Sequence, residues 1–250
     1  MTEVIDFPPG NYRFIRGPFQ YSAGARALPG YAVRRIAFRR PVPLAVGFSR
    51  IAATLQAAGR PLTTLCACEL RSPAPFTDHG FRSFNEIYVG TLSQWGLFDG
   101  ALNPVARSNV CPEIDPPAEP CFHAFSFTVA DSAAASFVIA GSGEASEGQG
   151  PYRDRIVSYG DVSPEGLRQK VHYVVGEMER RLAALGVGWS DTTATQVYTV
   201  HNVFPLLADE IVRKGAAAFG VTFHHCRPPV IGLDYEMDCR GVENGSIENV

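Results

Sequence analysis

The order of elements expected along the chain occurs twice, and this repeat constrains the fold more strongly than any single motif. A helical apolar pattern over residues 44–58 stops at Gly59, and a second one over residues 163–185 stops at Gly186. Each glycine is followed by a strand-like run, a further helical pattern and two more strand-like runs. We therefore interpret the chain as an internal duplication, in which two similar units follow each other.

The repeat predicts two domains of the α+β class. One covers residues 1–130 with an irregular N-terminal arm that carries a short strand or two, and the other covers residues 131–250 with a short, frayed C-terminal tail. Each is expected to form a mostly antiparallel sheet with two helices on one face. The run LCACEL (65–70) carries apolar residues on both faces of its strand. The uncovered faces of the two halves, or of several chains, should therefore pack sheet to sheet, with functional sites in the clefts between these copies of the repeated unit.

Composition and charge argue against several classes of partner. The 250 residues are 46% hydrophobic with a formal net charge of −3, so a large core is available and nucleic acid is not an expected partner. The absence of a long apolar run and the acidic, proline-rich start indicate a cytoplasmic protein without a signal peptide or membrane span. The six cysteines lack a CxxC pair and are expected as reduced thiols, with Cys66 and Cys68 on one face of a strand and no metal site.

Arg107 is the main candidate functional residue. It stands alone among small residues in the run NPVARSNV (103–110), which suits a strand that delivers one guanidinium into a pocket. The planar guanidinium of arginine binds a carboxylate through two parallel hydrogen bonds. A surface position is the alternative interpretation. In the first interpretation, Asn109 and Val110 become candidates for substrate contact.

Several words in this order resemble the RidA/YjgF family of imine and enamine deaminases. In the first half, NPVARSNV resembles that family's Pro-Ala-Arg-Ser-Thr-Val strand, and the word at 85–88 (NEIY) resembles its Asn-Glu-Val-Tyr. In the second half, SFVIAGS (136–142) and IGLDYEMDCRGV (231–242) resemble its Val-Ser-Gly-Gln and Val-Glu-Ile-Glu-Ala strands. The resemblance implies two tandem RidA-like (chorismate-mutase-like) domains, no cofactor, and a homo-oligomer, most simply a trimer with a pseudo-sixfold content of domains.

The same resemblance implies roles for particular residues. The substrate-gripping arginine falls on Arg107 and the strand-end glutamate on Glu236, while backbone groups near Val110 or Gly141 are placed to hold water or the imine nitrogen. The first half lacks the glutamate and the second half lacks the Ala-Arg-Ser word. The Ser-Gly-Gln strand end is altered, and Gly141 and Ser142 at that place are candidates for substrate binding. Because each half keeps different parts of the pocket, we expect a composite site.

Two further residues are candidates for substrate binding. Tyr21, in the N-terminal arm, is placed to close over a neighbouring pocket, with loop packing as the alternative role. Arg227 lies in the run HHCRPP (224–229), which stands where the second half lacks its own arginine word.

Three functions remain open at this point. The first is a cofactor-independent hydrolase or deaminase acting on a small carboxylated imine or enamine, such as 2-aminoacrylate. The second is a chorismatase-like enzyme that releases pyruvate from an enol ether, because Cys226-Arg227 followed by the residues 233–236 (LDYE) resembles the end of chorismatases. The third is a protein that binds a small acid without turnover.

Overall fold

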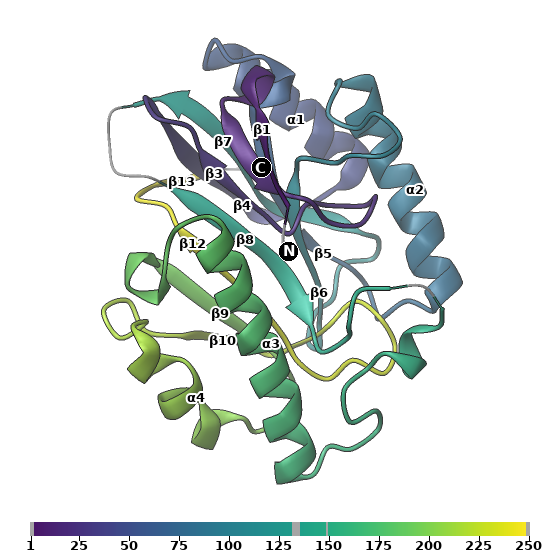
Figure 1. Ribbon diagram of the computed structural model, residues 1–250. Helices are drawn as coiled ribbons and strands as arrows, with labels where there is room; N and C mark the ends of the chain where they lie inside the picture. Colours follow the sequence, from purple (N-terminus) through teal and green to yellow (C-terminus); the bar gives the residue numbers. More distant parts are fainter. Residues whose placement is uncertain (1–2, 132–135, 149, 249–250) are drawn as a thin grey trace.

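The computed structural model describes residues 3–131, 136–148 and 150–248, which form four layers. Two sheets lie face to face at the centre, with a pair of helices outside each sheet (Figure 1). On one side lie α1 (Leu44–Ala57) and α2 (Asp78–Gln94), and on the other lie α3 (Pro164–Ala184) and α4 (Phe204–Glu210). The fold is therefore a mixed α+β structure, as predicted.

The two sheets are mixed and share a common strand order. The first sheet has the order β11-β6-β5-β7-β4-β13, and its strands are β11 (Cys226–Arg227), β6 (Ala106–Pro112), β5 (Leu65–Arg71), β7 (Cys121–Ala130), β4 (Tyr31–Pro43) and β13 (Asn244–Glu248). The second sheet has the order β1-β2-β3-β8-β12-β9-β10, and its strands are β1 (Val4–Phe7), β2 (Tyr12–Ile15), β3 (Gly24–Ala27), β8 (Phe137–Gly143), β12 (Glu236–Gly241), β9 (Ala194–Tyr198) and β10 (Thr222–His224). The run β4-β7-β5-β6 in one sheet matches β8-β12-β9-β10 in the other. In both runs the final pair is parallel and the other pairs are antiparallel.

Apolar residues at helical spacing attach each helix pair to its own sheet. Ile51 and Leu55 of α1 belong to one fully buried cluster with Phe122 and Phe125 of β7. On the other side, α3 begins where predicted, because Ser163 Oγ accepts the N–H of Gly166 at 3.2 Å and Pro164 is its first residue. One face of α3 then packs against β12, through the buried side chains of Val171, Val174, Val175, Met178 and Leu182.

The faces of the two sheets that carry no helix pack against each other within one chain. Small side chains dominate this layer, so the sheets approach closely; its buried members are Tyr12, Phe14, Ala25, Ala27, Val33, Cys66, Ala67, Ala106, Val138 and Ala140. The packing of sheet on sheet expected from apolar strands is thus present without a second chain. The expected trimer stays a prediction.

Both ends of the chain differ from the prediction. The N-terminal arm forms three strands, β1, β2 and β3, where one or two were expected in an irregular segment, and β3 pairs with β8 through Gly24 and Ile139. The predicted frayed tail instead forms β13, which runs parallel to β4 with Asn244 opposite Arg34. The tail side chains are mostly exposed, so its pairing rests on backbone hydrogen bonds that leave no apolar pattern. Each half thus adds strands to the sheet of the other half, and the division at residues 130 and 131 stays a prediction.

The cysteines lie in the core, but Cys66 and Cys68 do not share one face of their strand as predicted. All six are unbonded and buried. Cys66 faces the opposite sheet, whereas Cys68 faces α2, because β5 has an irregular register between Leu65 and Ala67.

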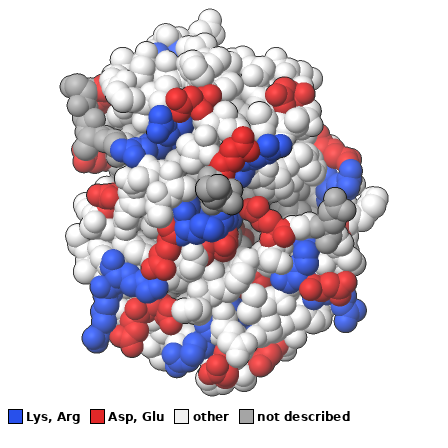
Figure 2. All heavy atoms as spheres, in the orientation of Figure 1, with Lys and Arg blue, Asp and Glu red and all other residues white. Residues whose placement is uncertain are grey.

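Two surface features complete the description. No helix in the described part of the chain is long and apolar enough to cross a membrane. On the face drawn in Figure 2, acidic and basic side chains lie intermixed rather than in one continuous basic patch.

Gly47 provides a test of the packing between α1 and the first sheet. A Cβ at this position would lie 2.3 Å from Cδ2 of Phe122, whose ring is fully buried. We predict that Gly47→Ala lowers the free energy of unfolding by about 1–3 kcal/mol, because the core must shift to accept the methyl group. Gly90 in α2 is exposed with open space around its Cα, so Gly90→Ala should instead raise it by about 0.5–1 kcal/mol. Denaturant titration measures both values, and equal effects of the two substitutions would contradict the packing described.

Candidate active site

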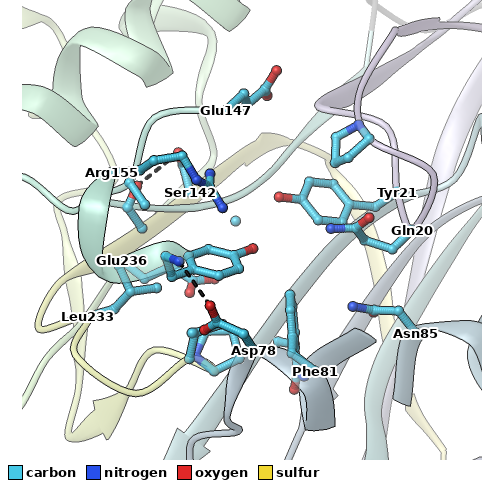
Figure 3. Close-up of a pocket in the computed structure, with 18 of the residues that line it drawn as sticks. Gln20, Tyr21, Asp78, Phe81, Asn85, Ser142, Glu147, Arg155, Leu233 and Glu236 are labelled. Carbon is cyan, nitrogen blue, oxygen red and sulfur yellow. Dashed lines mark hydrogen bonds between the residues drawn. The ribbon is translucent and has the colours of Figure 1, made fainter. Parts of the chain in front are cut away.

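A cavity of about 640 Å³ is lined by residues of both halves of the chain. Figure 3 shows Glu236 and Leu233 on one side of it and Gln20, Tyr21 and Asn85 on the other. Six of the candidates chosen from sequence line this cavity, namely Tyr21, Arg107, Asn109, Gly141, Ser142 and Glu236. Arg107 and Glu236, which lie far apart in the sequence and in different sheets, therefore open into one space.

Arg107 on β6 is a buried cation, 3% exposed, held by neutral groups. Its Nη1 donates to Asn85 Oδ1 of α2 at 2.6 Å. Four aromatic rings surround the guanidinium carbon, with centroids between 4.9 and 5.8 Å away: Tyr21, Phe81, Phe84 and Tyr88. Among the described residues, no carboxylate lies within ion-pair distance of Arg107. Burial lowers the pKa of its guanidinium, and an anionic ligand would offset that cost.

Glu236 is the first residue of β12, and its carboxyl is buried at 4% exposure. Burial raises the pKa of Glu236 well above its usual value, and the nearby Asp238 raises it further, while the charge of Arg107 acts in the opposite direction. Asp238 is itself held by Gln196 Nε2 at 2.7 Å and Tyr198 OH at 3.0 Å. The site therefore favours a neutral Glu236 that carries a proton.

The end of β8 lies directly against this carboxyl. A Cβ at Gly141 would lie 2.2 Å from Oε1 of Glu236, so only glycine leaves the carboxyl where it is. Arg181 of α3 fixes this strand end, donating to Ala140 O at 3.1 Å and to Ser142 Oγ at 3.2 Å. The backbone of β8 and the carboxyl of Glu236 thus form one continuous wall of the cavity.

The cavity wall offers hydrogen-bonding atoms that the protein itself does not use. Buried side-chain atoms without a partner among the described residues include Gln20 Oε1, Asn109 Nδ2, Arg155 Nε and Arg181 Nε, and all four residues line the cavity. Buried polar atoms in proteins are nearly always paired. Three of these four atoms are donors, so the wall is suited to a ligand rich in hydrogen-bond acceptors.

The segment after β8 crosses from the second half to the first and closes one side of the cavity. Tyr152 N–H donates to Asp78 Oδ2 at the start of α2, at 3.0 Å, and its ring packs edge-on against Phe81. A buried ionic cluster holds the root of this segment, because Lys170 Nζ contacts both Glu144 Oε1 at 3.3 Å and Asp234 Oδ2 at 2.8 Å. Asp234 therefore serves this cluster and does not share the cavity face of Glu236.

Two candidates from the sequence lie elsewhere. Val110 follows Asn109 on β6, so its side chain points to the opposite face and packs with Tyr198 and Cys226. Its carbonyl is also occupied, accepting the N–H of Ser72 at 2.9 Å. Arg227 on β11 is outside the cavity, where its guanidinium makes two hydrogen bonds to Glu113 at 2.6 and 3.0 Å. The residues around Arg227 in the sequence do not indicate that Glu113, which is distant in the chain, is its partner.

Sequence reasoning missed several polar residues of the wall, among them Asn85, Arg181 and Arg155. Asn85 belongs to a word that the sequence singled out, but only its contact with Arg107 reveals its role. Arg181 interrupts the apolar face of α3 between Met178 and Leu182. An arginine on the apolar face of a helix indicates a buried polar site, so the sequence could have identified it. Arg155 lies in an irregular segment with no pattern to mark it.

The carboxyl of Glu236 makes stability depend on pH. In the unfolded chain its pKa is that of an ordinary glutamate, about 4.3, whereas the folded protein holds it higher. The folded state therefore binds this proton more tightly. As a consequence, the free energy of unfolding falls as the pH rises from about 4 through the raised pKa.

We predict that Glu236→Gln raises the free energy of unfolding at pH 8, because the amide has no proton to lose. The gain should be about 1.4 kcal/mol for each unit by which the pKa is raised, and it should vanish below about pH 4. Denaturant titrations at both pH values measure it, with the exposed loop variant Glu119→Gln as the matched control. A gain of equal size at both pH values would contradict the raised pKa.

Comparison with known proteins identifies the family to which the chain belongs. A 2-amino-5-chloromuconate deaminase from Comamonas testosteroni is 52% identical over 244 residues, which cover 96% of this chain and 97% of that protein. A crystal structure of a chorismatase aligns with a TM-score of 0.53 at 12% identity, covering 95% of this chain and 78% of that chain, which shows a similarity of fold alone. The resemblance to the RidA/YjgF family is not shown by these comparisons and stays a prediction. The family model for the 2-aminomuconate deaminase CnbZ matches residues 4–246, and the chain therefore belongs to this family.

Proposed function

We propose that the protein is a deaminase that hydrolyses the C–N bond of a carboxylated enamine of the 2-aminomuconate type. The observation that carries the proposal is that a buried arginine with no acidic partner among the described residues and a glutamate whose raised pKa favours the neutral form face the same cavity. Membership of the 2-aminomuconate deaminase family and the 52% identity to a 2-amino-5-chloromuconate deaminase support the choice of substrate class. A six-carbon substrate replaces the three-carbon acid suggested by sequence alone.

In this proposal Arg107 holds the carboxylate next to the carbon that bears nitrogen. Its guanidinium supplies parallel donors for the two carboxylate oxygens, and the hydrogen bond from Nη1 to Asn85 Oδ1 fixes its orientation. The four aromatic rings keep water away from the pair, which strengthens its electrostatic attraction. Asn109 Nδ2, a buried donor without a partner, is available for a further contact.

Glu236 is the group that moves protons. The neutral carboxyl first donates its proton to a carbon of the enamine, so that the double bond shifts and an iminium forms at C2. The carboxylate then takes a proton from a water molecule as the water oxygen bonds to C2, which gives a carbinolamine. Glu236 next protonates the nitrogen, and the C–N bond breaks as the carboxylate recovers the hydroxyl proton. One water is consumed, ammonia and a 2-oxo acid are released, and Glu236 ends neutral.

The other two functions have less support. The chorismatase similarity, at 12% identity, concerns the fold alone and does not extend to chemistry. A non-catalytic binding protein would need the arginine but not a proton-carrying Glu236 beside it. Both stay expectations from the sequence.

The role of Arg107 can be tested by measuring ammonia release from 2-aminomuconate. We predict that Arg107→Gln lowers kcat/KM by about a hundredfold, since a hydrogen-bonded charged contact contributes a few kcal/mol. The kcat/KM of Arg107→Lys should lie between those of the wild type and Arg107→Gln, because the charge remains but the planar guanidinium is lost. Arg40→Gln, at an exposed position of β4, is the matched control and should match the wild type. Absence of turnover above the protein-free rate, or full activity of Arg107→Gln, would rule out the proposed function.

A further inference from the structure

The cavity contains a second arginine that the proposed reaction does not use. Four arginines line the cavity: Arg82, Arg107, Arg155 and Arg181. Arg82 pairs with Glu86 at 3.0 Å, and Arg181 has Glu147 and Glu177 at 3.9 Å on either side. In the described part of the chain, Arg107 and Arg155 are the two that have no carboxylate within ion-pair distance.

The surrounding structure fixes Arg155 in place before any ligand binds. Its backbone carbonyl accepts the N–H of Ser146 at 3.1 Å, and the next residue, Ile156, forms a bridge with Ala145. Its guanidinium carbon lies 4.5 Å from the centre of the Tyr152 ring, and Nη1 donates to Ser146 O. The buried Nε has no partner among the described residues, which leaves a donor unused at the cavity wall.

Arg155 and Arg107 approach the cavity from different sides. Figure 3 shows Arg155 with Ser142 and Glu236, across from Asn85, which is the residue that binds Arg107 at 2.6 Å. Tyr152 lies within the electrostatic reach of both cations, since the charges of Arg155 and Arg107 each lower its pKa against the effect of burial. The cavity therefore has one positive end on β6 and another on the segment that follows β8.

From this arrangement we infer that Arg155 binds the second carboxylate of the substrate and makes the site selective for dicarboxylates. The inference rests on the proposed function for the identity of the first end, where Arg107 holds the carboxylate nearest the amino group. A dicarboxylate places one anion at each unpaired guanidinium, whereas a monocarboxylate leaves Arg155 without a partner. Selectivity then follows from charge complementarity at the far end of the molecule.

The test uses two unreactive six-carbon ligands, so it does not depend on turnover. trans,trans-Muconate carries a carboxylate at each end of a diene, and sorbate carries the same diene with a single carboxylate. Isothermal titration calorimetry should show that the wild type binds muconate about 10–100-fold more tightly than sorbate. Arg155→Gln should bring the affinity for muconate down to that for sorbate, and should leave sorbate binding within about twofold of the wild type.

A matched control comes from the same segment. Arg153 is exposed, lies over the Tyr159 ring at 5.3 Å and does not line the cavity, so Arg153→Gln should bind both ligands like the wild type. Arg155→Lys, which keeps the charge, should retain part of the preference for muconate. Equal binding of muconate and sorbate by the wild type would overturn the inference, as would an equal loss of both ligands in Arg155→Gln. A protein that fails to deaminate 2-aminomuconate but shows the Arg155-dependent preference would refute the proposed reaction and leave the dicarboxylate site standing.

Discussion

The site depends on a buried guanidinium that the protein does not neutralise with an acid. Transferring a charged group out of water is costly unless it is paired, and among the described residues the guanidinium of Arg107 contacts Asn85 and aromatic faces but no carboxylate. Glu236 lines the same cavity, and burial together with the charge of Asp238 raises the pKa of its carboxyl, which favours the neutral form. An ionised Glu236 would compete with a substrate carboxylate for the same cation. The cavity can therefore hold the cation of Arg107, the neutral carboxyl of Glu236 and a substrate carboxylate at the same time.

The duplicated strand order explains why one cavity can draw on both halves. In each sheet the matched run of four strands ends in a parallel pair, and the sheets face each other through small side chains such as Ala106 and Ala140. The approach is so close that a Cβ added at Gly141 of β8 would lie 3.2 Å from Ser108 Cα on β6. The first half supplies Arg107 and Asn85, and the second supplies Glu236 and the strand end. Each half thus needs to keep only part of the pocket.

The repeated strand order and several residues that line the candidate site could be predicted because they leave local patterns. Helical spacing predicted α1 and α3, and the words around Arg107, Gly141 and Glu236 led to residues that line the cavity. What could not be predicted lacks such a pattern. β13 pairs through its backbone while its side chains stay exposed, and Arg155 lies in a segment with no periodicity. Val110 lies away from the cavity for a different reason. The family motif identifies the strand, but side chains alternate along a strand, so the motif does not say which of them reach the cavity.

The most direct measurement is a crystal structure of the protein with trans,trans-muconate bound. The account predicts that one carboxylate makes two hydrogen bonds to the guanidinium of Arg107, and that the adjoining carbon lies beside the carboxyl of Glu236. It also predicts that no side-chain carboxylate contacts Arg107 in crystals grown without ligand. Muconate bound away from Arg107, or an acidic side chain paired with Arg107 in the ligand-free crystals, would contradict the account.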